Sequence, residues 1–106
     1  MTVTVYEALA DPVRRRVLEL LAEKDRAAGE VAAEFEISRP AVSRHLRVLR
    51  DSGLVRSRGD AQRRVYSLEP RTLEELEDWL DSIHRFWAGR LDRLEQELER
   101  RKEERT

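Results

Sequence analysis

The spacing of apolar residues predicts a mostly helical chain with one small β-hairpin. Over most of the chain, apolar residues recur every three or four positions, as on helices that bury one face. Two shorter runs, 54–58 and 63–68, are strand-like, and the turn-type residues from Gly59 to Gln62 would join them as a four-residue loop. The expected helices cover residues 3–9, 12 to about 21, 28–35, 39–52 and 71–102.

Local signals mark several helix ends. Asp11 followed by Pro12 is typical of an N-cap with proline at the first helical position. Ser38 is predicted to cap the fourth helix, and Gly53 to end it just beyond the C-cap. The start of the third helix is weakly marked, because Ala27 stands at the N-cap position. A capping Ser or Thr there would stabilise the helix by about 1 kcal/mol.

The fourth predicted helix has two sharply different faces. At about 100° per residue, Val42, Leu46 and Leu49 lie within about 60° of one another and form a narrow apolar stripe. Ser43, Arg47 and Arg44 lie about 100°, 140° and 200° from Val42. We expect the stripe to pack inward and the Ser/Arg face to meet solvent or a ligand.

The final helix carries an apolar stripe that a small domain cannot cover. Its apolar residues recur in steps of three and four, and Trp79 and Phe86 widen the stripe. About 30 residues of helix span roughly 45 Å. We therefore expect part of this face to contact another subunit. The stripe consists of Leu73, Leu76, Leu80, Ile83, Trp87, Leu91, Leu94 and, at its far end, Leu98.

The net charge of −1 hides a strong segregation of charge. Residues 1–37 and 71–106 each have a net charge of −3, whereas residues 38–66 carry eight arginines against two carboxylates, a net charge of +6. A basic middle between acidic ends is typical of a polyanion-binding surface.

The chain has no cysteine, which excludes disulfides and thiolate metal sites. No apolar run predicts export or membrane insertion, so a cytoplasmic location is expected.

These features together predict a helix-turn-helix followed by a β-hairpin wing. The second helix of such a unit fits the major groove of double-stranded DNA, where arginine can bond guanine in a bidentate manner. Free N–H groups at the helix start, beside Ser38, suit a phosphate. The predicted contacts in the helix are Ser38, Arg39, Pro40, Ser43, Arg44 and Arg47. Those in the wing are Arg58, Arg63 and Arg64.

Other interpretations remain open for single residues. The wing arginines either contact DNA or keep an exposed sheet edge soluble. His45 lies toward the apolar side of its helix, so a structural role is expected before a phosphate contact. His84 lies near Asp81, and a carboxylate/His metal site shared by the two subunits of a dimer is conceivable. The final helix has only this one histidine, however, so no metal or other cofactor is expected. The sequence offers no phosphate-binding glycine loop and no paired nucleophile and base, so no enzymatic activity is predicted.

Three segments resemble the ArsR-type winged-helix repressors of bacteria and archaea: ALADPVRRRVLELL, AGEVAAEFEISRPAVSRHLRVLRDSGLV and RRVYSLEP. The resemblance covers Tyr6 to about Pro70, and the final helix in character. It implies a homodimer paired through its terminal helices. It also implies an operator of two inverted half-sites and release from DNA by a signal. On the matching positions, it implies DNA contacts at Ser38, Arg39, Ser43, Arg44 and the three wing arginines.

The chain departs from this family pattern at several positions. Val31, Ala32 and Ala33 occupy the stretch where metal-sensing members carry cysteines, and the histidine pair of their last helix is absent. Glu36 stands where a turn glycine is common, and is expected to hold a positive φ at some cost. The segment FWAGRLDRLE is similar to the branch without metal sites, whose inducer is often unknown.

The resulting prediction is a mainly α protein with a small β-hairpin, a winged helix-turn-helix with a long C-terminal dimerisation helix. One domain is expected over residues 1–106, with the helix-turn-helix at 28–53, the wing at 54–68 and the terminal helix at 71–102. The predicted function is sequence-specific DNA binding by a homodimeric transcriptional repressor. The alternative is a protein-interaction adaptor that uses the terminal helix and never contacts DNA.

Overall fold

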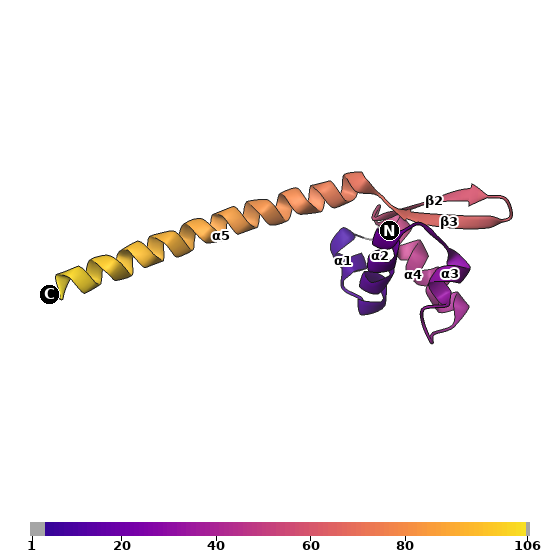
Figure 1. Cartoon of the computed structure of the whole chain (residues 1–106), viewed down its shortest axis with the longest axis horizontal. Coiled ribbons are helices and arrows are strands. Elements are labelled where there is room, and N and C mark those ends of the chain that lie inside the picture. Colours follow the sequence, from indigo (N-terminus) through magenta and orange to yellow (C-terminus); the bar gives the residue numbers. More distant parts are fainter. Residues whose placement is uncertain (1–3, 106) are drawn as a thin grey trace. The chain divides into compact units, whose positions relative to one another are not determined.

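The computed structural model describes residues 4–105. The chain divides into two compact units, one ending at Leu73 and one beginning at Glu74. Along the chain the elements follow the predicted order of helices and hairpin (Figure 1). They are α1 (Val5–Leu9), α2 (Pro12–Glu23), β1 (Arg26–Ala27), α3 (Ala28–Ala32), α4 (Arg39–Asp51), β2 (Val55–Asp60), β3 (Arg63–Leu68) and α5 (Pro70–Glu104). One additional short strand, β1, precedes α3.

The predicted mainly helical fold with a small antiparallel sheet is confirmed, but the sheet has three strands rather than two. β1 pairs with β3, and β3 pairs with β2, so the order is β1-β3-β2. The sequence analysis missed β1 because two residues cannot show an alternating pattern. Ala27, in β1, is buried opposite Val65 of β3, which places β1 over the core.

The hairpin loop is shorter than predicted. Gly59 and Asp60 belong to β2, and Asp60 pairs directly with Arg63, so only two residues form the turn. Ala61 has a φ of 58°, a conformation that glycine adopts more readily. Because the turn lacks the usual glycine signal, the sequence pattern favoured a longer loop.

Four other expectations on the helices need correction. α3 ends at Ala32 rather than residue 35, because the amides of Glu34 and Phe35 bond to carbonyls three residues back, and the helix tightens into turns. Glu36 does not have a positive φ; among the described residues only Ala61 and Gly53 do. α1 begins at Val5, capped by Thr4, and residue 3 of its predicted range lies outside the described residues. α5 starts one residue earlier and ends two residues later than predicted.

The core of the first unit lies around α4. This helix contacts α1, α2, α3 and β2. Val42, Leu46 and Leu49 are almost fully buried, as the apolar stripe predicted. They pack with the inner faces of the other helices and of the sheet, whose fully or nearly fully buried residues are Ala8, Val17, Leu20, Leu21, Val31, Leu54, Val55 and Val65.

A Schellman motif ends α4 and leads the chain into the wing. The amide of Leu54 donates to the carbonyl of Leu49 (3.1 Å), and the amide of Gly53 donates to the carbonyl of Arg50 (3.0 Å). Gly53 has a φ of 86°, which confirms its predicted role beyond the C-cap. Leu54 thereby enters the core, and β2 begins at the next residue.

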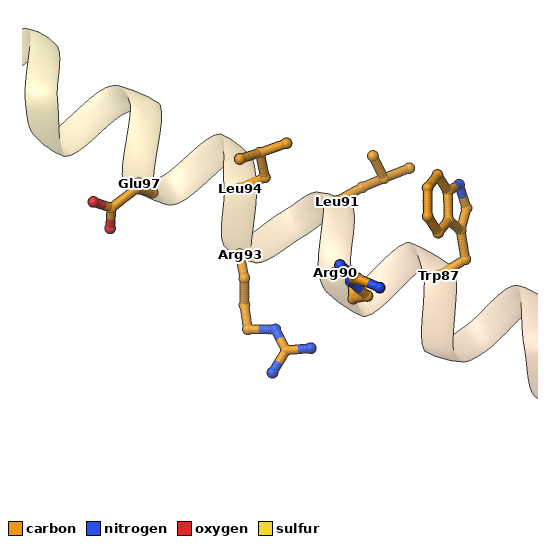
Figure 2. A pocket seen from close by; sticks show the side chains of 6 residues that line it. All are labelled: Trp87, Arg90, Leu91, Arg93, Leu94 and Glu97. Atoms are coloured by element: carbon orange, nitrogen blue, oxygen red, sulfur yellow. The ribbon is translucent and has the colours of Figure 1, made fainter.

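The second unit is the long helical part of α5, which has no buried residue. Its apolar stripe is exposed: the side chains of Leu80, Trp87 and Leu94 are 57%, 56% and 56% exposed. Figure 2 shows Trp87, Leu91 and Leu94 projecting from one side of the helix, where they line an open groove. Among residues 4–105, no helix is long and apolar enough to span a membrane.

Gly53 provides a direct test of the helix end. Gly53→Ala forces a side chain into the left-handed region, and its Cβ would lie 3.5 Å from Oγ1 of Thr72. We expect a loss of about 1 kcal/mol in the free energy of unfolding, measured with urea at fixed protein concentration. Gly59→Ala is the matched control, because nothing lies within 4 Å of its Cβ position, and it should change stability by less than about 0.5 kcal/mol. Equal losses in both variants would contradict this account.

The N-cap of α2 predicts a specific response to acid. Oδ1 of Asp11 accepts bonds from the amides of Val13 (2.8 Å) and Arg14 (3.3 Å). Desolvation by burial raises the pKa of Asp11, but these two amide bonds, with His45 and Arg14 nearby, outweigh it and lower the pKa below 3.8. This carboxylate therefore contributes stability above that value and loses it as the pH falls.

We expect Asp11→Asn to be nearly neutral at pH 7, since Asn caps helices as well as Asp does. The variant should lose less stability than the wild type when the pH is lowered from about 5 into the acid range. Unfolding curves at a series of pH values test this, and parallel losses in the two proteins would refute it. Asp11→Ala, which removes the cap altogether, should cost about 1 kcal/mol at pH 7.

Candidate nucleic-acid interface

The polar face of α4 begins at a well-formed cap. Oγ of Ser38 accepts a hydrogen bond from the amide of Ala41 (3.3 Å), and Pro40 lies in the first turn, both as predicted. The remaining amides of the first turn point out of the helix start, where an anion would be stabilised. All six predicted contact residues of this region are exposed, and the buried stripe lies on another side of the helix: Ser38, Arg39, Pro40, Ser43, Arg44 and Arg47.

Arg39 lies against the preceding helix. Its Nη2 atom is 3.4 Å from the position that a Cβ would occupy on Gly29 of α3. Glycine therefore leaves room for the guanidinium where the two helices approach each other. The sequence carries a signal for this contact that the prediction missed, because a glycine inside a helical pattern indicates a close approach of another element.

His45 connects α4 to the rest of the first unit. Its Nδ1 atom lies 3.3 Å from Nη1 of Arg14. Arg14 also donates from Nε to the carbonyl of Ala8 (2.7 Å) and from Nη2 to the carbonyl of Glu7 (3.0 Å). Arg14 thus satisfies carbonyls at the end of α1 and contacts α4 with the same guanidinium. This contact supports the structural role expected for His45.

The wing arginines are exposed, as predicted, but they are not equivalent. In the strand register, Arg58 pairs with Val65 and Arg63 with Asp60, so both lie on the sheet face shared with the buried Val65. Arg64 pairs with Gly59 and lies on the opposite face, where it donates to Oγ of Ser57 (3.1 Å).

Two carboxylates outside the wing pair with Arg58 and Arg63, the arginines on the face of Val65. Nη1 of Arg58 lies 2.9 Å from Oδ2 of Asp25, in the link between α2 and β1. Nη1 of Arg63 lies 3.4 Å from Oε1 of Glu30 in α3. The sequence analysis missed both partners, because each lies 33 residues away from its arginine.

The arrangement of these elements defines a winged helix-turn-helix, a class of DNA-binding domain. α3 and α4 are the two helices, α4 exposes a face rich in arginine, and β2 and β3 form the wing. Within residues 4–105 there is no cluster of three or more His, Cys, Asp or Glu side chains arranged to hold a metal ion.

Comparison with known proteins agrees with this class. Residues 11–57 match the model of the arsR family of bacterial regulatory proteins. The HTH-type transcriptional regulator Rv2034 of Mycobacterium tuberculosis is 46% identical over 86 residues, covering 81% of this chain and 78% of that protein. The transcriptional repressor SdpR of Bacillus subtilis is 36% identical over 76 residues, covering 72% of this chain and 84% of the repressor.

A solved structure extends the similarity through most of the chain. The ArsR-like transcriptional regulator from Rhodococcus sp. RHA1 superimposes with a TM-score of 0.76 and 30% identity, covering 90% of this chain and 87% of that one. The chain belongs to the arsR family of bacterial regulatory proteins. It is a DNA-binding transcriptional regulator and not an enzyme, and this membership favours DNA binding over the adaptor alternative.

Proposed function

We propose that the chain is a homodimeric repressor that binds an inverted-repeat operator through α4 and the wing. The observation that carries this proposal is the division of α4 into a fully buried apolar stripe and an exposed face of arginine and serine. Because the stripe fixes the rotation of the helix, the exposed side chains are held in one orientation toward a groove. The proposed location is the cytoplasm, where bacterial chromosomal DNA lies.

The exposed face offers both kinds of contact that operator recognition needs. Arg44 and Arg47 have the length and the donor geometry to bond O6 and N7 of guanine in the major groove. Ser38 and the neighbouring amides suit a backbone phosphate, which sets the register of the helix on DNA. Arg64 would add a phosphate or minor-groove contact from the outer face of the wing.

The exposed stripe of α5 supports dimerisation through this helix. Seven large apolar side chains between Trp79 and Leu94 are more than 40% exposed, which is unusual for a single helix in water. A second copy of the same stripe would cover them by a two-fold contact between α5 helices. The proposed interface residues are Leu73, Leu76, Leu80, Ile83, Trp87, Leu91 and Leu94.

A two-fold dimer implies a two-fold operator. The two copies of α4 would enter major grooves about 34–36 Å apart, one helical turn of DNA, or a multiple of that distance. Repression is proposed because SdpR, a relative at 36% identity, is named a repressor.

Arg44→Ala tests the recognition face. Loss of a bidentate contact to guanine should weaken binding to the preferred duplex by about 1–3 kcal/mol and relax the preference at one base pair of each half-site. The preferred duplex is obtained by selection from a random pool, and binding is measured by fluorescence anisotropy. Arg16→Ala is the control, because Arg16 is an exposed arginine of α2 that pairs with Glu19. Equal losses in the two variants, or equal binding of the wild type to every duplex, would contradict recognition by α4.

Ile83→Glu tests the dimer. The side chain is 46% exposed in the protomer, so a charge there should leave the first unit folded but disrupt an apolar contact between two α5 helices. Light scattering should report a dimer for the wild type and a monomer for the variant at micromolar concentration. Arg85→Glu is the control, because it places a glutamate about 160° around the helix, with an even larger change of charge, and should remain dimeric. A monomeric wild type would refute the proposed interface.

A further inference from the structure

We propose that Asp25 and Glu30 are built-in competitors for the wing arginines, which DNA phosphates must displace. In the free protein, each carboxylate holds one guanidinium that a winged-helix protein would otherwise present to DNA. The two pairs thereby reduce the attraction of the wing for DNA of any sequence. This inference rests on the proposed DNA-contacting surface.

The sheet register explains why only two of the three wing arginines are held. Arg58 and Arg63 lie on the face that also carries the buried side chain of Val65, and this face is turned toward the protein interior. Their guanidinium groups reach carboxylates of the body of the domain. Arg64 lies on the opposite face, where it donates to the neutral hydroxyl of Ser57.

The carboxylate of Glu30 is itself fixed in place. Its Oε1 atom accepts a hydrogen bond from the amide of Ala27 (3.1 Å), the residue that lacks a capping side chain of its own. Glu30 therefore stays at the start of α3 when Arg63 leaves it. Arg63 also lies 3.6 Å from Oδ2 of Asp60, so two carboxylates surround its guanidinium.

The exposure of these pairs makes the exchange feasible. Arg58 and Asp25 are 57% and 46% exposed, and ion pairs at such positions contribute little to stability. A phosphate can accept a charge-assisted, bidentate bond from the same guanidinium. The displaced carboxylate then remains within a Debye length of that phosphate and repels it. A paired arginine thus contributes less to DNA affinity than an unpaired one.

The experiment uses the full chain and a duplex of mixed sequence, with affinity measured by anisotropy between about 50 and 200 mM salt. Asp25→Asn should tighten binding roughly two- to fivefold, the strength of one exposed ion pair. The slope of log K against log salt should become steeper by up to about 0.9, because the charge of Arg58 is then no longer offset by a carboxylate beside the phosphate. Glu30→Gln, which keeps an oxygen for the amide of Ala27, should act in the same direction through Arg63.

Glu23→Gln is the matched control. Glu23 lies two residues from Asp25 and carries the same charge, but it pairs with Arg26, whose side chain is only 11% exposed. This variant should tighten binding less than Asp25→Asn and leave the salt slope unchanged. In an Arg58→Gln background, Asp25→Asn should have no larger effect than the control, since its competitor role requires Arg58.

Three results would overturn the inference: weaker binding by Asp25→Asn, a gain equal to that of Glu23→Gln, or a gain that persists without Arg58. Weaker binding would mean that Asp25 positions Arg58 for DNA instead of withholding it. Thermal unfolding of each variant confirms that the fold is retained. If the wild type failed to bind any duplex, the proposed contact surface itself would be wrong, and that result appears before any variant is compared.

Discussion

The burial of one face of α4 is the constraint on which the rest of the first unit depends. Val42, Leu46 and Leu49 fit against α1, α2, α3 and β2, so the helix can be neither rotated nor shifted without exposing apolar surface. The same burial directs Arg44 outward. At the helix end, Gly53 reverses the chain and returns Leu54 to the core, which sets where the wing begins. One apolar stripe thus positions both parts of the proposed DNA-binding surface.

Several arginines in this chain bond to backbone carbonyls at helix ends, and one of them also connects two helices. Arg14 and Arg15 donate to carbonyls at the end of α1, and Arg14 also contacts His45 on α4. Arg26 donates to the carbonyl of Leu20 at the end of α2. Short helices leave many carbonyls without partners, and long cationic side chains satisfy them from neighbouring elements. A count of arginines therefore overstates the charge that is available to DNA.

Sequence reasoning succeeded where the signal is local and failed where it depends on the tertiary structure. The caps at Asp11 and Ser38, the stop at Gly53 and the stripe of α4 are encoded within a few residues, and all were predicted. β1 was missed because its two residues are a strand only through pairing with β3. The partners of Arg58 and Arg63 could not be predicted, since they come from elements 33 residues away. Strand alternation alone places Arg63 and Arg64 on opposite faces, but which residues of β2 share each face depends on the register that the two-residue turn imposes.

The distribution of carboxylates gives the charge segregation a more specific meaning. Residues 38–66 have a net charge of +6, yet Arg58 and Arg63 are paired with Asp25 and Glu30 from the acidic N-terminal part of the chain. Among residues 4–105, the arginines of this segment without a carboxylate partner lie mainly on α4, the proposed base-reading helix, and at Arg64. Base contacts distinguish sequences, whereas phosphate contacts attract any duplex. If the wing is balanced as we propose, the protein relies more on α4 for affinity, and its binding should follow the sequence of the DNA more closely than its charge alone implies.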